Sequence, residues 1–179
     1  DYTNAFRSRD LGILCRRKAL PMKNVTLAKL RAVDRNLLHA AKAAMETAYN
    51  PYSNFFVGAA ILTLDGEVVT GSNVENAAYS AVICAERSAI VRASAMGHKL
   101  LRRVALIGRG AKAPSKEVIS PCGLCRQMLF EASQVMGEDI EVIMSSSDMK
   151  KIIISSVNEL LPLGFGPANL GLNLQRFKK

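Results

Sequence analysis

Apolar residues recur at steps of three and four between positions 26 and 49, the spacing of one face of a helix. The positions that follow this spacing are Leu27, Leu30, Val33, Leu37, Leu38, Ala41, Ala44 and Met45. The Asn50-Pro51 pair ends the pattern, because a residue that precedes proline resists helical backbone angles. The chain is therefore predicted to form a helix over residues 26–49, with one apolar face turned toward a core.

A largely apolar run comes next, at residues 55–64, and predicts a buried strand, with residues 67–74 as its partner strand. The Asp65-Gly66 pair between them is typical of a hairpin turn, since such turns need a residue with positive φ. We therefore expect these two strands to be antiparallel neighbours.

Beyond the hairpin, helical spacing alternates with short apolar runs. Helices are predicted at residues 84–97 and 122–137, strands at 103–108, 140–144 and 151–154, and a short helical turn with an irregular tail at 155–179. Such an order predicts an α/β fold, a three-layer α/β/α architecture with one mixed central sheet and helices on both faces.

The positive charge is concentrated near the N-terminus. The 179-residue chain has a net charge of +9, and residues 1–35 hold nine Lys/Arg against three Asp/Glu, a surplus of six. We expect residues 1–25 to be a basic N-terminal extension and residues 26–179 to form one folded domain. The extension is interpreted as a solvated or disordered arm. A trimmed organellar targeting sequence and a surface for anionic polymers are the alternatives.

Hydropathy argues against a membrane protein. No stretch reaches the roughly 18 to 20 continuous apolar residues that are needed to cross a bilayer. We therefore expect a soluble protein without a membrane partner.

Three cysteines and one glutamate carry the strongest chemical signal. Cys84-Ala85-Glu86-Arg87 opens one predicted helix, and Pro121-Cys122-Gly123-Leu124-Cys125 opens another. Structural zinc sites are normally closed by four protein ligands, whereas catalytic sites keep one position for water. Three thiol ligands with a carboxylate beside them therefore indicate a hydrolytic zinc site.

The spacing of these residues is consistent with a shared cation. Cys122 and Cys125 are three apart, so on a helix their sulfurs lie on one side, and Cys84 begins a different helix. Helix N-termini favour the thiolate form of a cysteine. Arg87 is a candidate to donate hydrogen bonds to a ligand sulfur and so tune the metal.

The same residues allow two other interpretations. Cys122 and Cys125 alone would form a redox dithiol, and Cys15 would complete a closed four-cysteine zinc site. Neither alternative gives a role to Glu86, which alone would be read as a favourable charge at a helix start. Beside the cysteines, Glu86 is interpreted as the group that takes a proton from activated water and passes it on.

The motifs together resemble those of a known family. The chain is similar to the cytidine deaminases that act on free nucleosides, in their all-cysteine zinc ligand form. The resemblance runs from about Leu37 to Leu170. Its motifs are Pro51 to Ala60, Asn73 to Ser80, Cys84 to Arg87, Pro121 to Gln127 and Leu160 to Pro167.

This resemblance implies a role for each matching position. It implies that Cys84, Cys122 and Cys125 hold one Zn²⁺ per subunit and that Glu86 is the proton shuttle. The implied substrate contacts are Phe55 on the pyrimidine ring, Asn73 and Glu75 on the ribose hydroxyls, and the backbone N–H of Ala85 on the base carbonyl, with Tyr79 and Phe165 at or near subunit boundaries.

The resemblance also implies an activity and an assembly. It implies hydrolytic deamination of cytidine and deoxycytidine in pyrimidine salvage, by a homotetramer with active sites near its subunit interfaces. The few cysteines favour a reducing compartment, the cytoplasm. An organellar location stays open if the extension is a targeting remnant. A nucleic-acid-editing protein that uses the basic arm, and a deaminase of nucleotides or nucleoside antibiotics, are the alternatives. No nucleic-acid partner is expected, because polynucleotide deaminases generally place a histidine where Cys84 stands.

Overall fold

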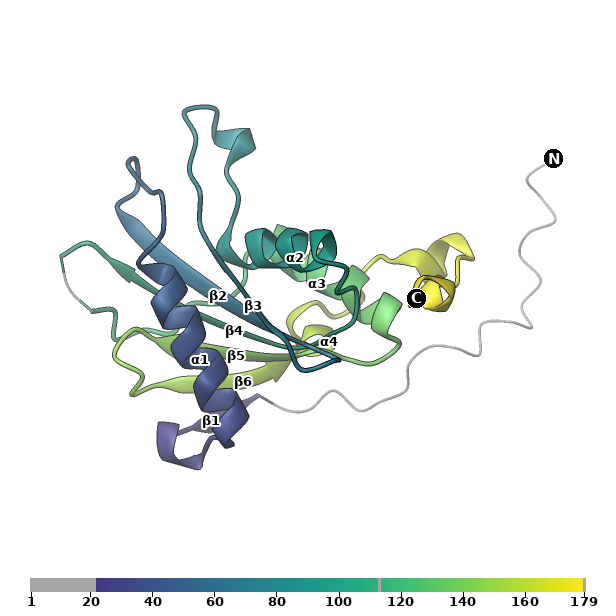
Figure 1. Cartoon of the computed structure of the whole chain (residues 1–179), viewed down its shortest axis with the longest axis horizontal. Coiled ribbons are helices and arrows are strands. Elements are labelled where there is room, and N and C mark those ends of the chain that lie inside the picture. Colours follow the sequence, from purple (N-terminus) through teal and green to yellow (C-terminus); the bar gives the residue numbers. More distant parts are fainter. Residues whose placement is uncertain (1–21, 113, 179) are drawn as a thin grey trace.

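The structure, a computed structural model, describes residues 22–112 and 114–178. Its centre is a mixed sheet of six strands in the order β1-β6-β5-β4-β2-β3 (Figure 1). The strands are β1 (Lys23–Val25), β2 (Phe55–Thr63), β3 (Val68–Ser72), β4 (Leu101–Gly110), β5 (Glu141–Ser146) and β6 (Ile152–Ser156). Only β4 and β5 run parallel among these neighbours, and the other pairs are antiparallel.

Helices cover both faces of this sheet and make three layers. One face carries α1 (Ala32–Met45), and the other carries α2 (Ala85–Ala95), α3 (Gly123–Met136) and α4 (Val157–Leu160) (Figure 1). Short 3₁₀ turns are η2 (Leu27–Lys29), η3 (Tyr79–Ala81), η4 (Pro167–Leu170) and η5 (Leu174–Phe177). The predicted α/β/α architecture with one mixed sheet is confirmed.

Each central strand supplies side chains to two separate cores. In β2, Ala59 and Ile61 face the α2 and α3 side, whereas Ala60 and Leu62 face α1. Successive side chains of a strand point to opposite faces, so a strand between two helix layers becomes continuously apolar. This burial explains why β2 shows an unbroken apolar run rather than an alternating one.

The predicted elements differ from the structure mainly at their ends. The first helix begins at Ala32 rather than at residue 26, because Leu30 and Arg31 have extended backbone angles that separate η2 from α1. Strand β1 was not predicted. Its three residues pair with β6, and so short an edge strand has no periodicity that could announce it. Residues 1–21 of the predicted extension lie outside the described residues.

Two glycines set how closely the helix layers approach the sheet. A Cβ atom on Gly58 of β2 would lie 2.0 Å from the carbonyl oxygen of Ala41 in α1. A Cβ atom on Gly71 of β3 would lie 2.5 Å from the backbone nitrogen of Ala89 in α2. Both helices therefore touch the sheet backbone to backbone at these points.

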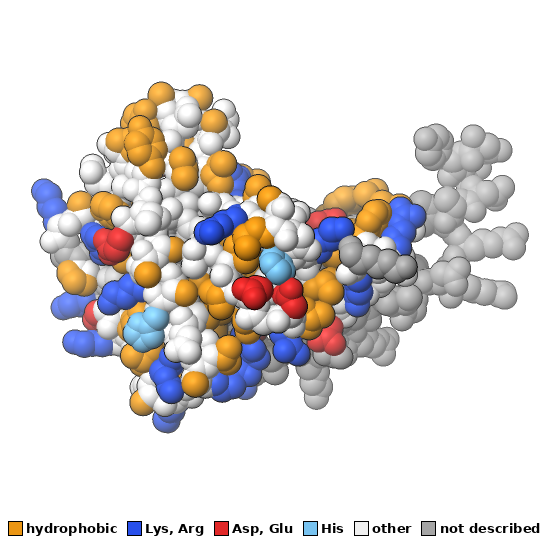
Figure 2. Space-filling view, viewed as in Figure 1, with side chains coloured by type: hydrophobic (Ala, Val, Ile, Leu, Met, Phe, Trp, Pro, Cys, Tyr) orange, Lys and Arg blue, Asp and Glu red, His pale blue; other side chains and the backbone are white. Residues whose placement is uncertain are grey.

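Two loops project beyond the layers at one end of the sheet. They connect α1 to β2 and β3 to α2, and Figure 1 shows them side by side above the sheet. Their exposed side chains are largely apolar, as the cluster at the top of Figure 2 shows. The large apolar side chains exposed on these loops are Tyr49, Tyr52, Val74, Tyr79 and Ile83.

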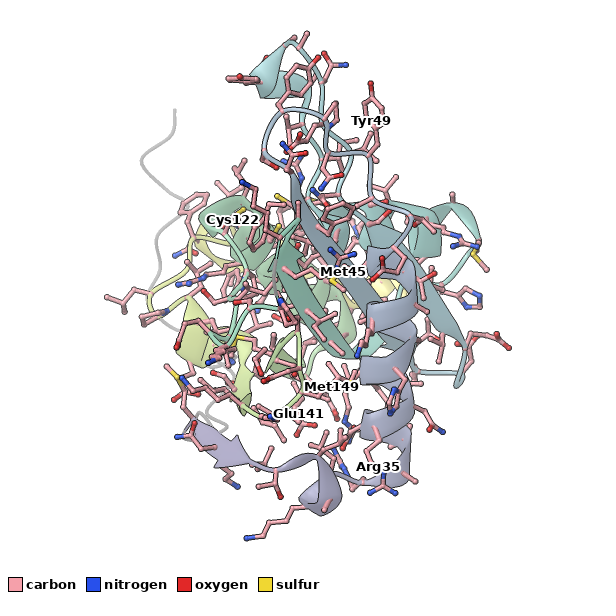
Figure 3. All side chains as sticks on the ribbon, turned by 90° about the vertical axis from the view of Figure 1, so that its left-hand side faces the viewer. Arg35, Met45, Tyr49, Cys122, Glu141 and Met149 are labelled. Carbon is pink, nitrogen blue, oxygen red and sulfur yellow. The ribbon has the colours of Figure 1, made fainter. Side chains whose placement is uncertain are left out.

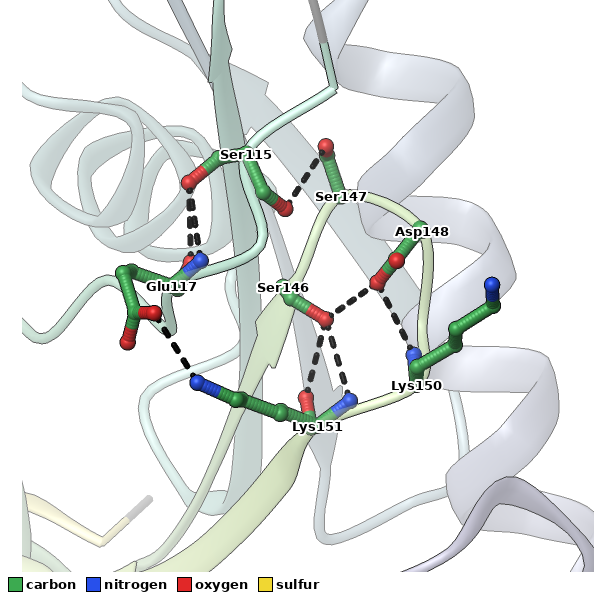
Figure 4. Close-up of polar contacts among 7 residues, drawn as sticks. All are labelled: Ser115, Glu117, Ser146, Ser147, Asp148, Lys150 and Lys151. Atoms are coloured by element: carbon green, nitrogen blue, oxygen red, sulfur yellow. Dashed lines mark hydrogen bonds and ion pairs between the residues drawn. The ribbon is translucent and has the colours of Figure 1, made fainter.

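The connection from β4 to α3 is fastened to the turn between β5 and β6 (Figure 4). The backbone N–H and the hydroxyl of Ser147 both donate to the carbonyl oxygen of Ser115, at 3.1 and 3.2 Å. The ammonium of Lys151 also lies 2.9 Å from the carboxylate of Glu117. The segment that leads to Pro121 and Cys122 is therefore anchored before it reaches α3.

No helix in the described ranges, 22–112 and 114–178, is long and apolar enough to cross a membrane.

Candidate metal centre and active site

The three predicted cysteine ligands meet at the N-termini of two helices. Cys84 is the residue just before the first turn of α2, and Cys122 has the same position in α3. Cys125 lies in the first turn of α3 and is fully buried. Figure 3 shows Cys122 on the other side of the sheet from Met45 of α1, so the cysteines belong to the α2 and α3 layer.

The distances between the sulfurs suit a tetrahedral cation. The Sγ atoms of Cys84 and Cys122 are 3.8 Å apart, those of Cys122 and Cys125 are 3.6 Å apart, and all three lie within 4.8 Å. Zinc–sulfur bonds of about 2.3 Å at tetrahedral angles would put neighbouring sulfurs about 3.8 Å apart. The three side chains can therefore hold zinc and leave its fourth position to a non-protein ligand.

The thiols influence one another electrostatically. A hydrogen bond from Cys125, with contributions from Cys122 and the charge of Arg87, lowers the pKa of Cys84 to about 6. The same bond and burial raise the pKa of Cys125. Cys84 therefore becomes a thiolate more readily than Cys125. A divalent cation would offset the negative charge of all three thiolates.

Glu86 is a buried carboxylate at the edge of the cysteine cluster. It lies in the first turn of α2 and is only 3% exposed. Burial is the main cause that raises the pKa of Glu86 to about 7, and the negative charge of Cys84 adds to it. A carboxyl group with such a pKa can both accept and release a proton near neutral pH.

Arg87 is bonded to the backbone that leads into Cys84, and its contact with a ligand sulfur stays a prediction. Its guanidinium donates to the carbonyl oxygen of Val82 at 2.6 Å, and no hydrogen bond to a ligand sulfur is found among the described residues. The positive charge of Arg87 still lowers the pKa of Cys84. Arg87 therefore acts on the cluster through its charge and by holding the backbone that leads into Cys84.

Asn73 is buried and is bonded to the neighbouring strand. Its side-chain oxygen accepts from the backbone N–H of Val57 at 2.8 Å, and its side-chain nitrogen donates to the carbonyl oxygen of Phe55 at 2.9 Å. An asparagine amide offers two donors and two acceptor lone pairs, so one of each remains. The sequence did not suggest this link from the end of β3 to the start of β2.

Glu75 holds the loop that precedes β2. Its carboxylate accepts from the backbone N–H groups of Tyr52 and Ser53, at 2.9 and 3.2 Å, and from the Ser53 hydroxyl at 2.5 Å. The hydrogen bond from that hydroxyl is the main cause that lowers the pKa of Glu75. The carboxylate is thus kept ionised. Its Oε2 accepts from both backbone N–H groups, whereas its Oε1 accepts only from the Ser53 hydroxyl among these contacts.

Phe55 and Ala85, the residues expected to contact the base, each begin an element of the fold. Phe55 is the first residue of β2, is 37% exposed, and lies so close to Gly108 that a Cβ there would be 3.2 Å from its ring. Ala85 is the first residue of α2 and fully buried. The first N–H groups of a helix have no acceptor within the helix, so they are suited to bind a ligand oxygen.

Tyr79 and Phe165 do not lie in the interior of the described chain. Tyr79 is 74% exposed in the projecting loop, where its ring packs edge-on against Tyr52 with centroids 6.0 Å apart. Phe165 is 62% exposed in the segment after α4. Both rings face outward, where a second chain could contact them.

Two further residues were present in a motif but received no role from the sequence. Arg126 and Gln127 follow Cys125 directly, and each donates to a backbone carbonyl after β6, on Leu160 and Phe165 respectively. Their partners lie more than 30 residues away in sequence, so no local spacing could predict these contacts.

Comparisons with known proteins agree with this geometry. Residues 31–137 match the model of the cytidine and deoxycytidylate deaminase zinc-binding region. A cytidine deaminase of Halalkalibacterium halodurans is 39% identical over 136 residues, which are 74% of this chain and 95% of that protein. A probable cytidine deaminase of Dictyostelium discoideum is 37% identical over 74% of this chain and 84% of that protein.

A solved structure shows the same arrangement of elements. The cytidine deaminase of Burkholderia pseudomallei superposes with a TM-score of 0.65 at 41% identity, over 73% of this chain and 97% of that one. The fold, the metal-ligand set and the sequence similarity thus lead to one conclusion, and the resemblance of the sequence motifs is confirmed. The chain belongs to the cytidine and deoxycytidylate deaminase family and carries its zinc-binding region.

Proposed function

We propose that the protein catalyses the zinc-dependent hydrolytic deamination of cytidine and deoxycytidine to uridine and deoxyuridine. One observation carries this function: three cysteine sulfurs lie within 4.8 Å of one another at two helix N-termini, beside the buried carboxyl group of Glu86. Relatives that are 39% and 41% identical over nearly their whole length are named cytidine deaminases.

The metal and the acid divide the chemistry. Cys84, Cys122 and Cys125 would hold the zinc ion, which when bound supplies an activated water molecule and a Lewis acid. Glu86 moves protons: it passes a proton from the water molecule to the ring nitrogen N3, and then passes the proton of the new C4 hydroxyl group to the amine, which departs as ammonia. Its burial keeps bulk water from competing for these protons.

The substrate is held by groups on either side of the metal centre. Phe55 packs against the pyrimidine ring, and the backbone N–H of Ala85 donates to the base carbonyl. Glu75 and the remaining donor and acceptor of Asn73 bind the ribose hydroxyls, since both side chains keep hydrogen-bonding capacity beyond their internal contacts. These assignments rest on position in the motifs and on the contacts of each side chain.

The protein is proposed to work as a homotetramer in which Tyr79 and Phe165 reach neighbouring subunits. Their exposed rings, and the apolar side chains around Tyr79 in the projecting loops, support this assembly, because contiguous exposed apolar surface marks interaction sites. We also propose that residues 26–179 form the catalytic domain. The protein would act in the cytoplasm, in pyrimidine salvage.

An ammonia-release assay tests the activity. Zinc-loaded protein is offered cytidine, deoxycytidine, cytosine and cytidine monophosphate in parallel, and the metal content of the same sample is measured. Turnover of the two nucleosides with about one zinc per chain is expected. Turnover of the monophosphate alone, or protein without stoichiometric metal, would reject the assignment.

A further inference from the structure

The segment of residues 160–166 is bonded to the helix that carries two of the metal ligands. Arg126 and Gln127 stand immediately after Cys125 in α3. Arg126 donates to the carbonyl oxygen of Leu160 at 3.0 Å, and Gln127 donates to the carbonyl oxygen of Phe165 at 2.9 Å. Two consecutive side chains thus fasten both ends of one segment.

Arg126 also holds the backbone that leads into Cys122. Its Nε donates to the carbonyl oxygen of Pro121 at 2.8 Å, and its other terminal nitrogen lies 3.4 Å from the hydroxyl of Ser120. One planar guanidinium therefore joins residues 120–121, called the metal loop below, to Leu160. A lysine could not make these contacts together, because its ammonium is a single point at the end of a flexible stem.

A similar arginine contact is present at α2, the helix that follows Cys84. Arg87, in the first turn of α2, donates to the carbonyl oxygen of Val82, five residues earlier. Arg126 bears the same relation to Pro121 in α3. In both helices an arginine holds the approach to the cysteine that precedes the first turn, but only Arg126 extends the contact to a distant segment.

Residues 160–166 are shaped to lie flat on α3. Added Cβ atoms on Gly164 and Gly166 would come within 3.2 and 2.6 Å of the ring of Phe130 in α3, so the backbone rests on that ring. Leu163 has a φ of 58° and a fully exposed side chain. A leucine keeps such a left-handed backbone only where its surroundings impose it.

We propose that Arg126 and Gln127 are positioning residues that make residues 160–166 part of the scaffold of the metal centre. Arg126 keeps the metal loop, and with it Cys122, in place. Gln127 fixes the backbone of Phe165 relative to the metal, so that the exposed ring is presented at a defined position. The role of Gln127 rests on the proposed deaminase function, whereas that of Arg126 concerns zinc retention alone.

Zinc release tests Arg126. Full-length zinc-loaded protein and its Arg126→Gln, Arg126→Lys and Arg92→Gln variants are mixed with a chromogenic chelator at a temperature where circular dichroism shows each to be folded. Arg92 is the matched control, because it also donates to a backbone carbonyl, that of Thr70, but on the outer strand β3.

Both Arg126 variants are expected to release zinc about 10- to 100-fold faster than the wild type, the usual cost of removing a group that orients a ligand. Arg92→Gln should match the wild type. Equal release rates for Arg126→Gln and Arg92→Gln would overturn the assignment. If Arg126→Gln does not fold, Arg126→Lys decides, and wild-type release from it would refute the role.

Steady-state kinetics on cytidine test Gln127. Gln127→Ala is expected to raise KM about fivefold, which corresponds to one neutral hydrogen bond, while zinc release stays at the wild-type rate. Gln134→Ala is the control, because within residues 22–112 and 114–178 the Gln134 side-chain amide donates only to the hydroxyl of Ser133 on its own helix. An unchanged KM, or a fall in kcat alone, would contradict the positioning role.

The two readouts separate this inference from the proposed function. A wild-type protein that binds zinc but does not release ammonia from cytidine would refute the proposed function. The rate of zinc release to the chelator would still decide the role of Arg126.

Discussion

The two faces of the sheet are covered in different ways, and the difference separates stability from chemistry. On one face, α1 buries large apolar side chains such as Leu37, Leu38 and Met45. On the other, α2 buries only alanines and the carboxylate of Glu86 against the sheet. Both helices touch the sheet closely at a glycine, so packing distance does not explain the contrast.

The contrast follows from what each face must hold. Large aliphatic side chains remove much apolar surface from water, at roughly 25 cal/mol per Å², and so stabilise the fold. Alanines contribute less, but they let the start of α2 lie against the sheet beside α3, where Cys84, Cys122 and Glu86 converge. Large buried side chains of both cores, such as Leu38 on the α1 face and Leu129 and Ile140 on the other, offset the cost of burying the Glu86 carboxylate.

The most severe way to break the chemical face is to remove a ligand. Cys122→Ala is expected to lose zinc and all measurable deamination, because two sulfurs cannot keep the cation against competing chelators. Metal analysis and ammonia release measure the effect.

Cys15→Ala is the control for that change. Cys15 lies outside the described residues, and we expect its variant to keep about one zinc per chain, as a three-cysteine catalytic site requires. Zinc loss from Cys15→Ala would instead indicate the closed four-cysteine site.

A change of one atom tests the acid on the same face. Glu86→Gln should lower kcat by about 10²- to 10⁴-fold, the contribution of a positioned general acid and base, and leave zinc content unchanged. Glu131→Gln, on the exposed surface of α3, is the matched control and should keep wild-type turnover. Wild-type-like turnover by Glu86→Gln would remove Glu86 from the mechanism.

The opposite face should respond in stability alone. Leu38→Ala removes a fully buried side chain from the α1 core and is expected to lower the free energy of unfolding by about 2–5 kcal/mol. Activity per folded, zinc-loaded molecule should stay constant, which denaturant titration and kinetics together would show.

A larger side chain between α2 and the sheet is the matching test on the other face. Ala89→Leu would press on Gly71, so we expect a loss of about 1–3 kcal/mol together with lower activity, because α2 carries Cys84 and Glu86. If Leu38→Ala and Ala89→Leu change the activity per zinc-loaded molecule equally, the two faces do not differ in their link to the chemistry.

The smallest expected effect concerns the loop tied by Glu75. A carboxylate whose pKa is lowered in the folded state stabilises above its ordinary value of 4.5, and this contribution is lost as the pH falls below it. Amide exchange at Tyr52 and Ser53, referenced to the intrinsic rate at each pH, should therefore lose protection in the wild type as the pH falls through the lowered pKa of Glu75. In Glu75→Ala the same two amides should be weakly protected at every pH. Identical protection of the two amides in the wild type and the variant would exclude the hydrogen bonds to Glu75.

Much of the fold could be predicted because its elements carry local signals. The apolar run of β2, the Asp65-Gly66 turn, where Gly66 has a φ of 97°, and the helix ends at Gly97 and Gly137 each follow from backbone preferences or burial. The ends of α1 were less predictable, since the extended backbone at Leu30 and Arg31 interrupts a helical spacing that continues in sequence.

The site divides in the same way. Cys84, Cys122, Cys125 and Glu86 could be singled out because ligand spacing is local and chemically specific. The link from Asn73 to β2 could not be predicted, since it depends on which segments fold together. The same reason hid the hydrogen bonds from Arg126 and Gln127 to residues 160–166.

Those hydrogen bonds have a consequence for how the protein is made. A ribosome delivers the three sulfurs well before Leu160 and Phe165, because the cysteines end at position 125. Domains begin to fold while they are still being translated. The cysteines are therefore made before the carbonyl partners of Arg126 and Gln127, and these two side chains can bond residues 160–166 only after that later segment has emerged.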